Sequence, residues 1–176
     1  EVIIVDDGSD DKTMKVLSEL RIENYELRIL KQDHKGTGSA RNEGVKHAGG
    51  EILVFVDADM TFEKNFIKNL VRPIELYIKG LPAGRRGTFS KDEYVSNWQN
   101  IWSRCYNKNE GWVDKRRHSK NYPDTQKVFR AILRTEFDKV NGFTAGGYND
   151  DWSLSEKLGY DAFFSPKAVF FHKNPE

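Results

Sequence analysis

The sequence predicts one α/β domain with a mostly parallel central sheet and helices on both faces. Two short apolar runs, Val2 to Val5 and Ile52 to Val56, have the composition of strands that are buried on both sides. Helical patterns and one further candidate strand separate these runs, which gives the order β-α-β-α-β. That order is typical of a parallel sheet with crossover helices. A length of 176 residues fits a single domain.

The first third of the chain alternates strands and helices. The predicted elements are strands at Val2 to Val5, Glu26 to Lys31 and Ile52 to Val56, and helices at Asp10 to Leu20 and Thr37 to His47. In the first helix, apolar residues recur at helical spacing and acidic residues occupy the first turn, where the helix dipole favours them. The pair Gly49-Gly50 ends the second helix.

The remaining residues indicate a mixed succession of elements. The predicted helices are Phe62 to Tyr77 with a kink or break at Pro73, a helix that begins at a Ser90–Glu93 capping box, Thr135 to Val140 ended by Asn141-Gly142, and Asp151 to Leu158 ended by Gly159. The predicted strands are Lys127 to Leu133, Ala162 to Phe164 and Ala168 to Phe171, and Leu81 to Gly87 is expected to be a loop.

An apolar stripe marks the helix expected after Ser90. Its members are Tyr94, Val95, Trp98, Ile101, Trp102 and Cys105. We expect this stripe, Cys105 included, to pack in the core. The alternatives are a wall for an acceptor molecule or a surface that rests at a membrane interface. The basic run from Lys115 to Lys120 is expected to be a solvated loop, with a phosphate or lipid-headgroup contact as the alternative.

Composition and charge exclude several classes of protein. Lys and Arg number 28 against 27 Asp and Glu, so the whole-chain charge predicts no nucleic-acid partner. No apolar stretch approaches the roughly 20 residues that cross a bilayer. A single cysteine excludes an internal disulfide, which fits a reducing compartment. Because a strand-forming run begins directly after Glu1, we expect further residues to precede it.

Acidic residues follow two of the predicted strands, at the point where each strand ends. Asp6 and Asp7 follow the first strand, and Asp57 and Asp59 follow the third. Ligands of open parallel sheets bind beyond the carboxyl ends of the strands, so we expect both pairs to face one crevice. Carboxylates gathered there repel one another unless a cation or hydrogen-bond donors offset them, and Mg²⁺ or Mn²⁺ would do so. The alternative is that these residues cap the following helices.

Four motifs in order give a family resemblance. They are VDDGSDDKT, GTGSARNEG, EILVFVDADM and GGYNDDWSLSEKLG. Together they resemble the inverting family 2 nucleotide-sugar glycosyltransferases with the GT-A fold, over nearly the whole chain except Ile78 to Asp124. The resemblance implies a Rossmann-like sheet with one more strand before Glu1. It also implies a donor-binding half at residues 1–60 and an acceptor-binding half with the catalytic base at residues 61–176.

The resemblance implies a metal-dependent transfer of sugar from a UDP- or GDP-sugar to an acceptor hydroxyl or phosphate, as in polysaccharide, glycolipid or glycan synthesis. It assigns Asp7 to the nucleobase, Asp57 to the ribose and Arg41 to the base or diphosphate, while Asp6 supports the loop. A surface ion pair is the alternative for Arg41. The acceptor would be a saccharide or lipid, and the location cytoplasmic, at or near the inner face of a membrane.

The same resemblance assigns the metal and the catalytic base. Asp59 of the DXD motif would hold Mn²⁺ or Mg²⁺, and His172 matches a position where some members place a further ligand. A cation that bridges the donor phosphates stabilises the leaving group. Asp151 would be the base that deprotonates the acceptor, with Asp150 and Trp152 on the acceptor side. The alternative is that Asn149 to Asp151 only cap a helix.

Three other functions stay open at this point. A noncatalytic nucleotide-sugar-binding domain would keep the donor site without turnover. A glycoside hydrolase would use paired carboxylates without metal or nucleotide. A dinucleotide-binding oxidoreductase is suggested by GTGSAR, although Arg41 stands where the third glycine of that fingerprint belongs.

The Gly146-Gly147 pair would let the loop before Asp150 close over bound ligands.

Overall fold

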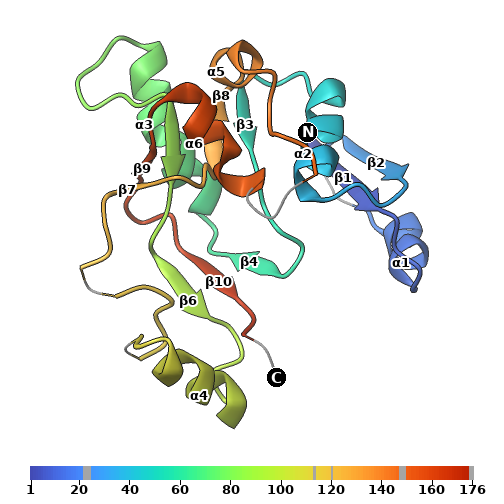
Figure 1. The fold of residues 1–176 in the computed structure, drawn as a ribbon, viewed down its shortest axis with the longest axis vertical. Coiled ribbons are helices and arrows are strands. Elements are labelled where there is room, and N and C mark those ends of the chain that lie inside the picture. The colour runs from blue at the N-terminus through green and yellow to red at the C-terminus, as the bar shows by residue number, and fades with distance from the viewer. Residues whose placement is uncertain (22–24, 113, 120, 147–149, 175–176) are drawn as a thin grey trace.

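The computed structural model describes residues 1–21, 25–112, 114–119, 121–146 and 150–174. Its first elements follow the expected alternation. They are β1 (Val2–Asp7), α1 (Thr13–Glu19), β2 (Leu27–Gln32), α2 (Thr37–His47) and β3 (Ile52–Val54) (Figure 1). The bounds predicted for α2 are confirmed at both ends, and the other four elements lie within three residues of the expected ranges. Local periodicity therefore describes this part of the chain well.

The later elements are shorter and more numerous than expected. The strands are β4 (Met60–Phe62), β5 (Gly87–Phe89), β6 (Glu93–Val95), β7 (Thr125–Gln126), β8 (Ala131–Leu133), β9 (Ala162–Phe164) and β10 (Phe170–His172). The helices are α3 (Phe66–Ile78), α4 (Ile101–Asn109), α5 (Arg134–Lys139), α6 (Ser153–Leu158) and the 3₁₀ turn η1 (Asp150–Trp152). Pro73 lies inside α3 without ending it.

The strands form three sheets. β1 pairs with β2 in parallel, a five-stranded sheet has the order β3-β8-β5-β9-β7, and a three-stranded sheet has the order β4-β10-β6. The α/β fold class is confirmed, but strand directions are more mixed than expected. In the five-stranded sheet only the β5–β9 pairing is parallel, and the other three pairings are antiparallel. Apolar runs predict buried strands but carry no information on strand direction, which explains the difference.

The helix expected to begin at the Ser90–Glu93 capping box is wrong in its first half. Residues Glu93–Val95 form β6, which pairs in parallel with β10 so that Glu93 lies opposite Phe170 and Val95 opposite His172. The Ser90 hydroxyl instead accepts a hydrogen bond from the Asp92 amide. Hydrogen bonding to a distant strand has overridden the local helical pattern.

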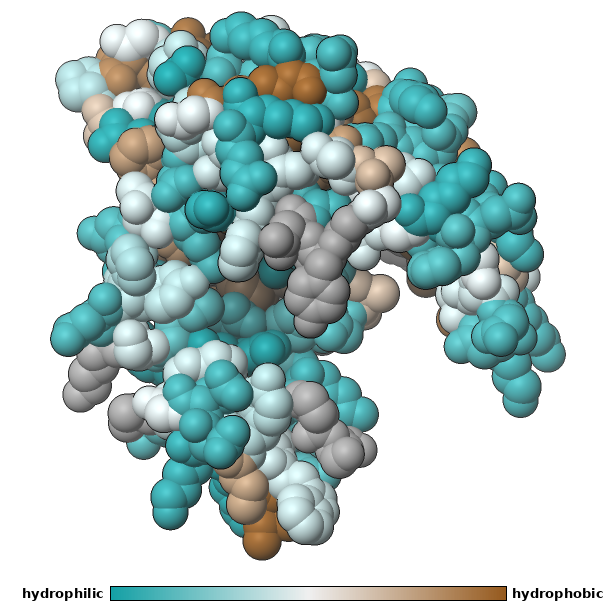
Figure 2. Space-filling view, viewed as in Figure 1, coloured by the Kyte–Doolittle hydropathy of each residue, from teal (hydrophilic) through white to brown (hydrophobic). Residues whose placement is uncertain are grey.

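The apolar stripe on α4 is exposed at several positions and is not packed in the core as expected. Ile101 and Trp102 are 60% and 67% exposed, and Cys105 is exposed. In Figure 1, α4 lies at the far end of the molecule from α2, below β6 and β10, and Figure 2 shows apolar surface at this tip. The expectation that Cys105 packs in the core is therefore wrong. In the described part of the chain, no helix combines the length and apolar character that a bilayer crossing needs.

Two apolar clusters stabilise the fold. One joins the aromatic rings of Phe55, Phe137 and Phe143, with the Phe55 and Phe143 centroids 5.1 Å apart. The other packs the buried face of α3, which includes Leu70 and Ile74, against the five- and three-stranded sheets. Both clusters support the ends of β3 and β4, between which Asp57 and Asp59 lie.

Candidate functional site

A groove of about 750 Å³ separates β1 from β3. Apolar side chains of both strands, including Ile3, Val5, Leu53 and Phe55, line most of it. Its lining also includes Asp7, Arg41 and Asp57, which lie at or next to the carboxyl ends of these strands or on α2. Asp7 and Asp57 therefore line one groove, at the place where ligands of an open sheet bind. Asp6 and Asp59 are not among its lining residues, so the expectation that both acidic pairs face one crevice is met by one member of each pair.

Asp7 is held by the loop that follows β2. Its Oδ1 accepts hydrogen bonds from Gln32 Nε2 at 2.6 Å and from the Lys35 amide at 2.9 Å, and its Oδ2 accepts one from the Gly36 amide at 2.9 Å. Burial alone would raise the pKa of Asp7, but these donors outweigh it and lower the pKa below its usual value. Asp7 thus fixes the start of α2 within the groove.

The loop-supporting role that the resemblance gave to Asp6 belongs to Asp7. Asp6 is 4% exposed, and its Oδ2 is buried without a hydrogen-bond partner among the described residues. Successive side chains of a strand point to opposite faces, so only one member of the pair can reach the loop.

Asp57 is paired with two arginines. Its Oδ1 accepts a hydrogen bond from Arg41 Nη2 at 2.9 Å, and its Oδ2 accepts one from Arg130 Nη1 at 2.8 Å. Burial raises the pKa of Asp57, but Arg130 and then Arg41 offset this and lower the pKa below its usual value. Arg130 precedes β8 and is placed here because the Phe55 amide donates to the Arg130 carbonyl. No local pattern in the sequence pointed to Arg130.

Arg41 connects the predicted donor site to the predicted base. It lies on α2, its side chain is 13% exposed, and its guanidinium stands 5.4 Å from the centroid of the Phe143 ring. Besides Asp57, it donates to Asp151 Oδ1. Burial would lower the pKa of Arg41, but the hydrogen bond to Asp151 and the charges of Asp151 and Asp57 outweigh it and raise the pKa. Arg41 therefore stays a cation between two carboxylates.

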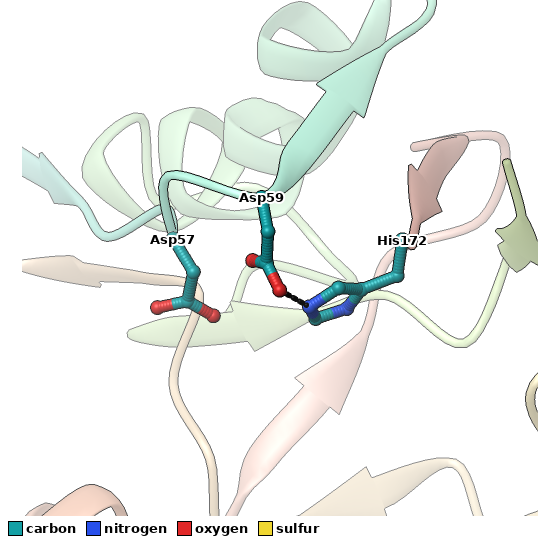
Figure 3. Close-up of side chains that lie close together, drawn as sticks. All are labelled: Asp57, Asp59 and His172. Carbon is teal, nitrogen blue, oxygen red and sulfur yellow. Dashed lines mark hydrogen bonds and ion pairs between the residues drawn. The ribbon is translucent and has the colours of Figure 1, made fainter. Parts of the chain in front are cut away.

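Asp59 and His172 come together through strand pairing. A turn closed by a hydrogen bond from the Met60 amide to the Asp57 carbonyl, at 3.2 Å, places Asp59 just before β4. Antiparallel pairing of β4 with β10 sets His172 opposite Met60. His172 Nε2 then lies 2.9 Å from Asp59 Oδ2 (Figure 3). Two residues that are 113 positions apart thus form one cluster.

This cluster fits a divalent cation. Ligand atoms of Asp57, Asp59 and His172 all lie within 4.8 Å of one another. Figure 3 shows the Asp59 carboxylate between the other two side chains. The Asp59 side chain is 56% exposed, so its oxygens can reach an ion that also contacts a ligand. Carboxylate oxygens suit Mg²⁺ and Mn²⁺, and imidazole nitrogen can complete the set.

Asp150, Asp151 and Trp152 form η1, directly before α6. Asp150 Oδ2 accepts a hydrogen bond of 2.6 Å from the Gly38 amide at the start of α2. A Cβ at Gly38 would come within 2.9 Å of Asp150 Cβ, so this approach requires glycine. The Asp151 side chain is 46% exposed, and Trp152 is 43% exposed with Lys127 Nζ 5.2 Å from its ring centroid. Gly147 and Asn149 of the same motif lie outside the described residues.

Glu93 is buried beside the site and differs from the helix-capping role that the sequence predicted for it. Glu93, assigned to a helix cap, contacts the far side of the His172 ring, with Oε1 at 2.8 Å from Nδ1. No short motif could have indicated this, since the two residues are 79 positions apart. Of the basic run, Arg117 and His118 turn inward toward Glu93, with side chains 17% and 16% exposed. The expected solvated loop is therefore partly buried, and Lys120 lies outside the described residues.

Comparisons with known proteins concern the family and the fold of the chain. The profile of the family described as Glycosyl transferase family 2 matches residues 1–140. Glycosyltransferase GlyA of Streptococcus pneumoniae is 22% identical over 99% of this chain and 25% of GlyA, and probable glycosyltransferase YdaM of Bacillus subtilis is 28% identical over 100% of this chain and 44% of YdaM. The structure of S. aureus TarS in complex with UDP-GlcNAc superposes with a TM-score of 0.66, at 19% identity over 100% of this chain and 50% of that chain. The chain thus spans half or less of the length of these relatives.

Proposed function

This chain belongs to glycosyl transferase family 2, and we propose that it carries out metal-dependent, inverting transfer from a UDP- or GDP-sugar. The observation that carries the proposal is the Asp59–His172 pair, 2.9 Å apart, next to a groove that Asp7, Arg41 and Asp57 line. The family gives the sugar-transfer chemistry, and this arrangement supplies a candidate cation site close to the carboxyl ends of β1 and β3. The UDP-GlcNAc bound to TarS supports a nucleotide-sugar donor.

The donor would bind at the carboxyl ends of β1 and β3, within residues 1–60. Arg41 and Arg130 already lie side by side on Asp57 and offer planar donor forks that suit a diphosphate. Asp7 would face the nucleobase and Asp57 the ribose. Asp59 and His172 would hold Mn²⁺ or Mg²⁺, which when bound stabilises negative charge on the departing nucleoside diphosphate.

The acceptor would be activated from residues 61–176. Asp151 would take the proton from the acceptor hydroxyl on the face of the sugar opposite the leaving group, as inversion by direct displacement requires. Its ion pair with Arg41, a residue that lines the donor groove, supports this assignment. Asp150 would hold η1 against α2, and the exposed Trp152 would offer an apolar face to the acceptor.

The exposed tip of the molecule suggests where the acceptor comes from. Ile101, Trp102 and Cys105 are exposed on α4, within the 78–124 segment, for which we propose an acceptor-side role. A saccharide or lipid acceptor would approach from this end, and a cytoplasmic protein that rests on the inner face of a membrane would present α4 to it.

Ligand binding tests this function directly. Thermal unfolding would be measured with UDP, GDP and UDP-GlcNAc, each with Mn²⁺, Mg²⁺ or a chelator, because ligands that bind only the folded state raise its apparent stability. We expect a nucleotide to raise the unfolding temperature more with Mn²⁺ or Mg²⁺ than with the chelator. Release of nucleoside diphosphate from the matching sugar nucleotide would then show turnover. Binding with no turnover would favour the noncatalytic domain, and no metal-dependent shift would contradict the proposal.

A further inference from the structure

A buried carboxylate stands behind the candidate metal site. Glu93 on β6 is 8% exposed. Its Oε1 lies 2.8 Å from His172 Nδ1 and 3.3 Å from Arg117 Nη1, and its Oε2 lies 3.0 Å from His118 Nε2. Parallel pairing of β6 with β10 holds Glu93 in this place, because the register sets Glu93 opposite Phe170, two residues before His172.

Glu93 is surrounded by nitrogen atoms that can donate hydrogen bonds. Its oxygens face the guanidinium of Arg117, a permanent cation, and ring nitrogens of His118 and His172, a setting that suits a carboxylate in its ionised form. An ionised carboxylate has no proton to donate and only accepts hydrogen bonds. Nδ1 of His172 therefore carries a proton and donates the hydrogen bond of 2.8 Å, which Glu93 Oε1 accepts.

The consequence for the other ring nitrogen follows from the tautomers of imidazole. When Nδ1 of a neutral ring carries the proton, Nε2 presents a lone pair. That lone pair would face Asp59 Oδ2, itself an acceptor, at 2.9 Å. Two acceptors at this distance repel each other unless a positive centre lies between or beside them. A second ring proton supplies that positive charge when His172 is an imidazolium, and a divalent cation would supply it when the ring is neutral.

We propose that Glu93 is a positioning residue, which keeps the proton of His172 on Nδ1 and so offers Nε2 to a divalent cation that Asp59 also binds. The inference deepens the proposed function and depends on it for the metal. Partners of this kind fix the ring orientation of a metal-binding histidine and raise its basicity. Through Arg117 and His118, Glu93 also ties the 78–124 segment to the same centre.

The test is the position of the His172 proton in the metal-free chain, read by long-range ¹H–¹⁵N NMR at mildly alkaline pH. His172 would be assigned by comparison with His172→Gln. In the unmodified chain we expect a proton on Nδ1. In Glu93→Gln the carboxylate charge is lost, Asp59 is the carboxylate that remains beside the ring, and we expect the proton of the neutral ring to move to Nε2. That tautomer blocks the ligand position, so Mn²⁺ affinity, measured by titration of free Mn²⁺, should fall about 10- to 100-fold.

A matched control separates this role from general loss of a buried carboxylate. Glu136 is also buried, at 4% exposure, and is bonded to Tyr160 and Lys139 on another part of the molecule. Glu136→Gln should leave both the His172 tautomer and the Mn²⁺ affinity unchanged. Equal effects of the two substitutions would overturn the proposal. So would a neutral His172 with its proton on Nε2 in the unmodified chain, a result that needs no variant to fold.

The His172 tautomer and the Mn²⁺ affinity test different parts of the proposal, and each can contradict its own part alone. If the unmodified chain does not bind Mn²⁺ but the proton moves in Glu93→Gln, the metal site of the proposed function is wrong while the control of His172 by Glu93 holds. If Mn²⁺ binds and the tautomer is the same with and without the Glu93 carboxylate, the metal site holds and the role of Glu93 is wrong.

Discussion

Asp57 and Asp59 stand two positions apart in the sequence, yet their surroundings differ in kind. Both oxygens of Asp57 accept hydrogen bonds from arginines, and its side chain is 32% exposed. Asp59 is 56% exposed, and within the described residues its carboxylate contacts His172. Arginine side chains of the protein neutralise the charge of Asp57, whereas the Asp59 carboxylate is free to bind a cation from solution. The difference teaches that, of two carboxylates in one motif, the first can be neutralised by side chains of the protein while the second stays open to solvent and to a cation.

The largest effect should come from the open carboxylate. Asp59→Asn removes an anionic ligand of the proposed cation, and we expect transfer to fall about 10⁴-fold, since metal stabilisation of a leaving group contributes several kcal/mol. The free energy of unfolding should change by less than about 0.5 kcal/mol, because the side chain is exposed. Initial rates of nucleoside diphosphate release and urea unfolding would measure both. Asp10→Asn, an exposed aspartate outside the site, is the control.

Unchanged sugar transfer in Asp59→Asn would contradict the proposed difference between Asp57 and Asp59, since it would mean that the exposed carboxylate binds no cation needed for transfer. A large loss of stability in the same variant would also count against it, because Asp59 would then be a structural residue like Asp57.

The next effect concerns the proposed base. Asp151→Asn should lower transfer about 10³-fold, within the usual range for general-base catalysis, while nucleotide binding with Mn²⁺ stays within a factor of a few. Donor binding would be followed by thermal shift and transfer by diphosphate release. Retained transfer would show that another group acts as the base. Weakened binding would mean instead that the Arg41–Asp151 ion pair shapes the donor groove.

Acid should destabilise the chain through Glu93. Its pKa is about 2 in the folded state against 4.5 for the ordinary side chain, so its contribution is present above pH 4.5 and is lost as pH falls from about 5 to 2. The size is about 3 kcal/mol, from the shift and 1.36 kcal/mol per pKa unit. Urea unfolding at a series of pH values should show a shallower acid loss in Glu93→Gln than in the unmodified chain. Parallel curves would mean that Glu93 titrates normally in the folded state.

The smallest effect should come from the paired carboxylate, and it should appear in stability. Asp57→Asn leaves Arg41 and Arg130 without their shared anion, and we expect a loss of about 2 kcal/mol in the free energy of unfolding, less than for a fully buried pair because Asp57 is partly exposed. The free energies of unfolding of Asp57→Asn and Asp59→Asn would be measured by urea unfolding and compared. Equal stabilities of the two variants would remove the distinction between the two carboxylates.

Much of the candidate site could be predicted from sequence because its residues lie at the ends of locally defined elements. Asp7 ends β1, Asp57 and Asp59 follow β3, and Arg41 lies on α2, whose bounds agree with the flanking glycines. A four-residue turn after a buried strand needs only local interactions. For the same reason the placement of Asp7 and Asp57 on one groove followed from the β-α-β-α-β order.

Tertiary structure decided what these residues contact. Arg130 reaches Asp57 across 73 positions, and His172 reaches Asp59 across 113. Glu93 had a convincing local pattern for a helix cap, yet it lies in a strand because β10 pairs with it. Periodicity reports which face of an element is apolar, and it carries no information about which distant strand will supply hydrogen bonds.

The sequence by itself thus determined the α/β class, the early alternation of elements and the acidic ends of two strands. The tertiary structure decided the direction of the later strands, the exposure of Cys105 and which carboxylate is neutralised. The physical reason is that local propensities amount to fractions of a kcal/mol per residue, whereas burial of a strand and pairing of a charge each contribute more and depend on partners far along the chain.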